Sequence, residues 1–319
     1  LEALWVSGRL HPEKKVIASG QAHYTHSRIT EVLGIPFAAI AVDAAGRMDV
    51  AAVEQELAGG DVGTVVVTIG NTGLGVIDPL PEILALQEKF NFRLHADAAY
   101  GGYFGLAEEL DASTRAIFDT LGSVDSIVID PHKHGLQPYG CGCVLFKDPS
   151  VGALYKHDSP YTYFSSGDLH LGEITLECSR PGASAVALWA THRLLPPIVG
   201  GDFANGLDAC LRAARQFWQR LDDSSTFTPL MRPELDIVDY AVNANTTSES
   251  SRRARKVFDE AARRDLHLAL IELPADFVNK YAPEILVDSE SVTCLRSVLM
   301  KPEQEDWIDR ITALLEASA

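Results

Sequence analysis

The sequence lacks any apolar run that approaches the length of a membrane-spanning helix, so we expect no membrane partner. Positive charge is scarce, because 27 lysines and arginines stand against 44 acidic residues and give a formal net charge of −17. Such an acidic chain is unsuited to nucleic-acid binding. Cysteine is scarce as well, with five residues in 319 and no spacing typical of a disulfide framework.

Two of the cysteines, Cys141 and Cys143, fall on the same side of an expected strand. No second pair of cysteines or histidines stands at ligand spacing, so we expect packed, reduced thiols and no metal site. Reduced thiols are typical of the cytoplasm, which is the location we expect.

The sequence contains enough apolar residues for a large hydrophobic core, since 46% of its 319 residues are hydrophobic. Short apolar runs alternate with helical stretches from residue 16 to 147. This pattern predicts an α/β fold with a mostly parallel sheet and helices on both faces. We expect a large domain over residues 1–200 and a small C-terminal α+β domain over residues 201–319.

A lysine follows one of the expected strands directly. Residues 127–129 form a short β-branched run typical of a buried strand, and Pro131 ends it because proline has no N–H for the ladder. Lys133 therefore lies at the sheet edge where open α/β folds bind their ligands. A lysine shielded from water there can act as a nucleophile, whereas the alternative is an ordinary surface-loop lysine.

An aspartate occupies the end of an earlier strand. Asp97 closes the apolar run 92–96 and is followed by two alanines and, after Tyr100, two glycines. A carboxylate suits pairing with a cationic ring nitrogen, and small neighbours let a flat ring approach the backbone. An aspartate and a lysine at two strand ends match the needs of pyridoxal phosphate, which takes a lysine imine and a pyridinium partner.

The segments 95–102 (HADAAYGG) and 125–133 (DSIVIDPHK) resemble the group II pyridoxal-phosphate-dependent amino-acid decarboxylases. The resemblance runs from residue 1 to the C-terminal helix. It implies the fold of the aspartate aminotransferase superfamily, a homodimer, and pyridoxal 5'-phosphate bound as an imine to Lys133. The implied activity is decarboxylation of a small-molecule substrate, an L-amino acid, to its amine and carbon dioxide.

The resemblance also implies roles for residues around the cofactor ring. Asp97 pairs with the ring nitrogen, His23 stacks on one ring face, and Ala99 packs on the other. His26 has no counterpart in the family, so we interpret it as a loop or helix-start residue ahead of a helix expected from about Ser27.

Two further residues are implied near the cofactor. Thr72 keeps a hydroxyl near the cofactor or substrate, although Asn71 stands where the family usually has another threonine. His132 is expected to contact the phosphate or to orient Lys133.

Four candidates lie later in the chain. Tyr161 and Tyr163 occupy a stretch where the family has a tyrosine that donates a proton after carbon dioxide leaves. Arg180 either binds the phosphate or pairs with a carboxylate. Arg296 lies in the last expected strand, where the resemblance implies binding of the substrate α-carboxylate through the two-point donor fork of arginine. A structural salt bridge is the alternative for Arg296.

The first residues, 1–6, have the character of the middle of a helix, without a cap. The resemblance places a Gly/Ser-rich phosphate loop before this helix, so we expect this chain to be one piece of a longer protein. Three hypotheses remain open at this point. They are an amino-acid decarboxylase, another enzyme class on the same fold (a carbon–carbon lyase, an aminotransferase or an aldehyde-forming decarboxylase), and an inactive fragment.

Overall fold

A computed structural model describes residues 1–156, 176 and 182–319 of the chain. The larger of its two sheets consists of six strands: β1 (Lys15–Ser19), β2 (Phe37–Ile40), β3 (Val62–Thr68), β4 (Arg93–Asp97), β5 (Ser126–Ile129) and β6 (Cys143–Phe146). They are ordered β2-β1-β3-β4-β5-β6. The first five run parallel, and β6 pairs antiparallel with β5 at the edge.

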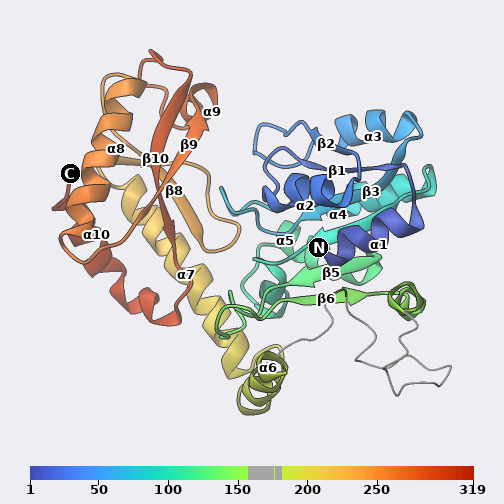
Figure 1. Cartoon of the computed structure of the whole chain (residues 1–319). Helices are drawn as coiled ribbons and strands as arrows, with labels where there is room; N and C mark the ends of the chain where they lie inside the picture. The colour runs from blue at the N-terminus through green and yellow to red at the C-terminus, as the bar shows by residue number, and fades with distance from the viewer. Residues whose placement is uncertain (157–175, 177–181) are drawn as a thin grey trace.

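Helices cover both faces of this sheet, as the alternating pattern predicts (Figure 1). They are α1 (Glu2–Leu10), α2 (Thr25–Leu33), α3 (Val50–Ala58), α4 (Leu80–Ala85), α5 (Ala112–Thr120) and α7 (Asp202–Asp222). The central strand β3 shows how the two layers form, because all seven of its residues are buried. Val66 packs with α1 and α2, while Val65 and Val67 belong to the core beneath α3, α4 and α5.

Local signals explain where several of these elements begin. The Asp49 carboxylate accepts hydrogen bonds from the amides of Ala51 and Ala52, which caps the N-terminus of α3. The start of α2 differs from the prediction. It begins at Thr25, before the expected start near Ser27, and this shift places His26 inside the first helical turn.

The C-terminal part forms an antiparallel sheet ordered β7-β8-β10-β9. Its strands are β7 (Phe227–Pro229), β8 (Ile237–Val242), β9 (Ala269–Pro274) and β10 (Ser291–Val298), and its helices are α8 (Thr247–Ala262), α9 (Ala275–Asn279) and α10 (Ile308–Glu316). The expected small α+β unit is therefore present. The exact domain boundaries stay a prediction, because α7 packs its first half in the large core and its second half in the small one.

The remaining helix, α6 (Ala183–Leu194), has no buried residue and stands out from the body of the protein (Figure 1). Among the described residues, no helix combines the length and the apolar character needed to cross a bilayer.

Candidate active site

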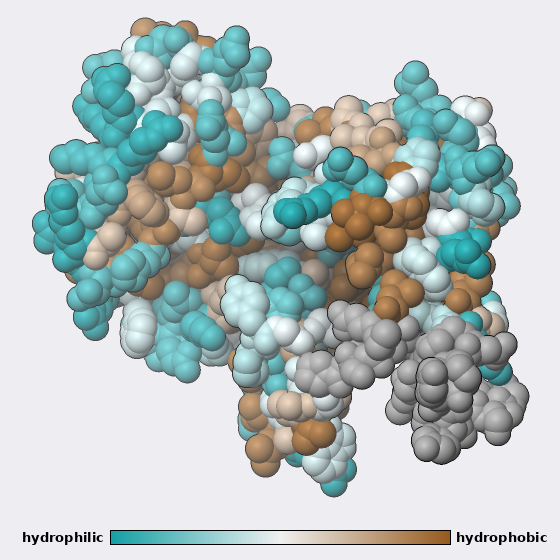
Figure 2. Space-filling view, in the orientation of Figure 1, coloured by the Kyte–Doolittle hydropathy of each residue, from teal (hydrophilic) through white to brown (hydrophobic). Residues whose placement is uncertain are grey.

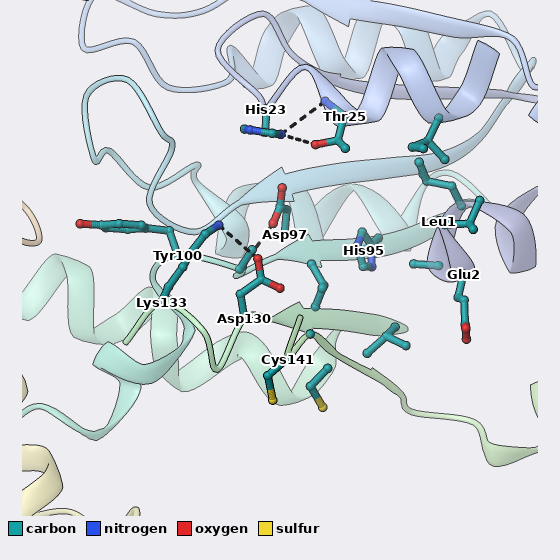
Figure 3. A pocket seen from close by; sticks show the side chains of 18 of the residues that line it. Leu1, Glu2, His23, Thr25, His95, Asp97, Tyr100, Asp130, Lys133 and Cys141 are labelled. Carbon is teal, nitrogen blue, oxygen red and sulfur yellow. Dashed lines mark hydrogen bonds and ion pairs between the residues drawn. The ribbon is translucent and has the colours of Figure 1, made fainter. Parts of the chain in front are cut away.

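A cavity of about 870 Å³ opens at the carboxyl ends of β3, β4 and β5. Five of the predicted site residues line it, although they come from separate parts of the chain: His23, Thr72, Asp97, Ala99 and Lys133. Figure 3 shows His23, Asp97 and Lys133 around this common space. The parallel strand order is what brings them together, since parallel strands end at the same edge of a sheet.

Asp97 lies at the end of β4 and is only 8% exposed. Its Oδ1 accepts a hydrogen bond from the amide of Ala99 at 3.2 Å, and its Oδ2 lies 2.7 Å from Nε2 of His26. Burial alone would raise the pKa of the Asp97 carboxyl. The hydrogen bond from His26 and the charges of His26 and His95 outweigh burial and lower this pKa to about 2. The site therefore contains a buried carboxylate that stays ionised at neutral pH.

Lys133 lies in the turn after β5, and its side chain is 32% exposed. Its Nζ pairs with Oδ2 of Asp130 at 3.2 Å, and Nε2 of His132 lies 3.5 Å from the same oxygen. The ring of His132 also contacts the carbonyl oxygen of Cys141 through Nδ1 at 2.7 Å. His132 is not among the residues that line the cavity. Of its two expected roles, this arrangement favours orientation of Lys133, exerted through the shared Asp130.

His23 lies at the cavity wall, and its Nδ1 contacts the hydroxyl of Thr25. Burial lowers the pKa of the His23 imidazole, and the nearby charges of Lys133 and His26 lower it further against the opposing effect of Asp97. The ring is therefore disposed to be neutral, as a residue that packs on a flat ligand would be.

The small residues after Asp97 have two different roles. Ala99 lines the cavity, as a ring-packing residue would. Gly101 instead serves the fold, because a Cβ there would overlap the carbonyl oxygen of Ile69 and block the turn that follows β4.

Arg296 lies on β10, and its Nε donates to the carbonyl oxygen of Gly73 at 3.0 Å, next to the cavity residue Thr72. The contact that Arg296 makes among the described residues is therefore a hydrogen bond to the backbone, and no ion pair with a described carboxylate accompanies it. The other three candidates, Tyr161, Tyr163 and Arg180, lie outside the described residues.

A second buried network lies beside the lysine turn. Asp236, which is fully buried just before β8, accepts hydrogen bonds from the hydroxyl of Tyr100 and from Nε2 of His134, the latter at 2.8 Å. Nδ1 of His134 lies 3.1 Å from the carbonyl oxygen of Tyr100. Both ring nitrogens thus face acceptors, which the ring satisfies only when each carries a hydrogen. The network connects the small sheet to the residue that follows Lys133.

Three residues of the site, His26, Asp130 and Asp236, were not predicted as functional from the sequence. His26 gave no local signal, since its partner Asp97 is 71 residues away in sequence. For Asp130 the signal was its i, i+3 spacing to Lys133. Asp236 gave no local signal, since its partner His134 is 102 residues away in sequence.

An amine and an ionised carboxylate at the ends of neighbouring parallel strands define a class of site, one for a ligand with a carbonyl group and a basic ring nitrogen. Comparisons with known proteins agree. Residues 5–242 match the conserved domain described as the pyridoxal-dependent decarboxylase domain. The chain therefore belongs to the pyridoxal-dependent decarboxylase family, and its cofactor is pyridoxal phosphate.

Individual relatives show the same similarity. The L-tyrosine decarboxylase of Enterococcus faecium is 27% identical, over 91% of this chain and 58% of that protein. A probable L-tyrosine/L-aspartate decarboxylase of Methanothermobacter thermautotrophicus is 33% identical, over 74% of this chain and 61% of that protein. The chain thus spans about three fifths of the length of these relatives.

Solved structures share the fold. Mouse CSAD in its apo form superposes with a TM-score of 0.78 at 19% identity, covering 97% of this chain and 65% of that one. Oryza sativa TDC with PLP and tryptamine gives a TM-score of 0.78 at 18% identity, covering 99% of this chain and 68% of that one.

The residues present fit the cofactor. The cavity offers a primary amine on Lys133, an ionised carboxylate on Asp97 and an imidazole on His23. It also contains a buried hydroxyl without a partner among the described residues, Oγ1 of Thr68. Thr68 is the neighbour of Asp97 in the register of β3 and β4, so this polar atom is available to a bound ligand.

Proposed function

We propose that the protein is a carboxy-lyase that decarboxylates an L-amino acid to its amine and carbon dioxide with pyridoxal phosphate. One observation carries the proposal. In a chain that belongs to the pyridoxal-dependent decarboxylase family, the amine of Lys133 and the ionised carboxylate of Asp97 line the same cavity at the strand ends.

The cofactor, when bound, supplies an electron sink for the bond that breaks. The chain supplies position and charge. Lys133 binds the cofactor covalently through its amine, and Asp130 orients that amine. Asp97 keeps the ring nitrogen protonated, because a buried carboxylate favours a cation beside it. His23 and Ala99 hold the plane of the ring.

Substrate orientation selects the reaction, since the bond to be broken has to lie perpendicular to the ring plane. Arg296 is the candidate for binding the substrate carboxylate, because the structure leaves its guanidinium without a carboxylate partner in the described residues. Thr72 is the candidate for a hydroxyl contact at the cavity wall.

Release of carbon dioxide and amine from a panel of L-amino acids tests this proposal. Tyrosine, aspartate and glutamate come first in the panel because relatives carry these substrates in their names. Stoichiometric amine and carbon dioxide from at least one of them supports a decarboxylase. Aldehyde or keto-acid products would assign the chain to another class on the same fold, and no turnover together with no bound cofactor would show an inactive fragment.

We also propose that the protein is a homodimer in which α6 takes part in the interface. Val186 and Trp189 are each 64% exposed, and Leu194 is 82% exposed. These side chains give α6 an apolar surface that no other described residue buries. Figure 2 shows apolar residues on this projecting part of the surface.

Sedimentation of the Trp189→Asp/Leu194→Asp variant tests the homodimer. We expect a monomer, because two buried charges disrupt an apolar interface. Trp307→Asp is the control, since Trp307 is 53% exposed but belongs to the C-terminal segment Pro302–Trp307 and not to α6, so its replacement should leave the dimer intact. A dimer in both variants would refute the role of α6.

The cytoplasm is the proposed location. All four cysteines in the described residues, Cys141, Cys143, Cys210 and Cys294, are free, and three of them are buried. Unpaired buried thiols suit a reducing compartment.

A further inference from the structure

His26 and Asp97 form a buried pair that the decarboxylase motifs do not account for. Nε2 of His26 lies 2.7 Å from Oδ2 of Asp97, and the two residues are 7% and 8% exposed. They are 71 residues apart in sequence, His26 in the first turn of α2 and Asp97 at the end of β4. Both line the cavity.

The other cationic groups around Asp97 are engaged elsewhere. Nδ1 of His95 bonds to the hydroxyl of Ser126 at 2.9 Å, and burial lowers the pKa of His95 to about 4, so that this ring is neutral at pH 7. Nδ1 of His23 contacts Thr25, and Lys133 pairs with Asp130. Among the described side chains, His26 is the one that gives Asp97 a hydrogen bond.

The hydrogen bonding of the His26 ring is directed at Asp97 alone. Its Nδ1 is buried and has no partner among the described residues. A buried imidazole with one unpartnered nitrogen costs stability relative to an apolar side chain of the same size. A residue that served only to pack α2 against the sheet would not need that polar group.

We propose that His26 is a positioning residue for Asp97, whose N–H holds the carboxylate ionised and fixes its orientation at the cofactor ring nitrogen. The amide of Ala99 fixes the other oxygen, so the two donors together set the plane of the carboxylate. The remaining lone pairs of the Asp97 carboxylate are available to a ligand in the cavity. The role of His26 toward the cofactor rests on the proposed function. The pairing of His26 with Asp97 can be measured in protein without cofactor.

The test compares two replacements of His26. His26→Leu removes the donor at similar volume, and His26→Gln keeps an N–H near the place of Nε2. His95→Asn is the matched control, because it alters the other buried histidine beside Asp97 while keeping a donor for Ser126. Should His26→Leu not fold, His26→Asn provides the same comparison with a polar side chain too short to reach the carboxylate.

The first measurement follows the carboxyl carbon of Asp97 by NMR against pH, in protein without cofactor. The wild type should titrate near pH 2, since the pKa of Asp97 is lowered to about 2. In His26→Leu the titration should move above the ordinary aspartate range, because burial is then no longer outweighed. His26→Gln should stay close to the wild type, and His95→Asn should raise the titration less than His26→Leu does, because the charge of His95 lowers the pKa of Asp97 less than the hydrogen bond from His26 does.

The second measurement uses protein loaded with pyridoxal phosphate labelled with ¹⁵N in the ring. The ring nitrogen should be protonated at pH 7 in the wild type and in His26→Gln, and should lose that proton in His26→Leu. Cofactor binding should weaken about 10-fold in His26→Leu, which corresponds to about 1.4 kcal/mol.

An unchanged titration of Asp97 in His26→Leu would overturn the inference, whatever the activity of that variant. Loss of the ring proton in His95→Asn to the same extent would also overturn it, because the effect would then not be specific to His26. If no amino acid is decarboxylated but the titration shifts as expected, the proposed function fails while the pairing stands.

Discussion

Replacing Asp236 by asparagine tests the buried network that connects the two sheets. The side chain of Asp236 is fully buried, and that of His134 is 1% exposed. Asparagine has nearly the same shape but no charge, so it leaves the doubly donating His134 ring without its counter-ion. Breaking a buried pair by removing one partner costs about 3–5 kcal/mol. Because asparagine keeps one acceptor oxygen, we expect about 3 kcal/mol, a large part of the stability of a typical domain.

Urea denaturation at pH 7, followed by tryptophan fluorescence, measures this loss in free energy of unfolding. Asp239→Asn is the matched control, three residues further along the same segment. Asp239 is also buried, but burial raises its pKa to about 8 despite the opposing charge of Arg296, so it is largely neutral at pH 7. The same substitution there should cause no loss and should raise stability at pH 7, because the raised pKa of Asp239 lowers wild-type stability above about pH 4.

A double replacement sharpens the test. Asp236→Asn combined with His134→Gln removes both charges, so its cost should fall below the sum of the single costs by at least about 1 kcal/mol. A loss in Asp236→Asn no larger than that in Asp239→Asn, or strictly additive losses in the double variant, would refute the idea of a buried ion pair.

Further predictions follow from the same geometry. Lys133→Ala should abolish covalent cofactor attachment, and borohydride reduction of the wild type should label Lys133; a label on another lysine would reassign the site. Asp97→Asn should keep the cofactor but reduce turnover at least about 100-fold, and near-normal turnover would exclude it as the ring partner. Of Tyr161→Phe and Tyr163→Phe, only one should reduce amine formation strongly at unchanged cofactor binding; equal activity in both would exclude these tyrosines as proton donors. The unfolded chain loses the Asp239 proton near pH 4 and the folded chain near pH 8, so wild-type stability should fall relative to Asp239→Asn across this window, by up to about 1.4 kcal/mol per pH unit. A pH-independent difference in urea denaturation would contradict the raised pKa of Asp239.

The sequence was informative wherever the signal was local. Strand ends were predictable because β-branched runs stop at residues such as Pro131 that cannot continue a ladder, and parallel strands bring their ends to one edge. That reasoning was sufficient to place Asp97 and Lys133 beside one cavity, whereas Ala99 came from the family resemblance. Burial on both faces was also readable from the three consecutive valines at 65–67 in β3.

The rest depended on contacts between distant segments. His26 looked like a helix-start residue because its partner Asp97 lies on another element, and a two-residue shift in the start of α2 decides whether it faces the sheet. His132 was expected at the phosphate or at Lys133, and only the placement of Asp130 between His132 and Lys133 favours the second. The pairing of His26 with Asp97 depends on packing geometry, which no spacing along the chain reports.

The helix α7 has a consequence for anyone who wishes to build chimaeras from this protein. Phe203, Leu207 and Leu211 belong to the core under the parallel sheet, whereas Ala214 and Phe217 belong to the core under the antiparallel sheet. If the C-terminal part were transferred from residue 200 onward, the large domain would lose these three apolar side chains from its core. The transferred part would carry the same side chains exposed to solvent. A graft that keeps each core whole has to be spliced inside the helix, between residues 211 and 213, with the helical phase preserved.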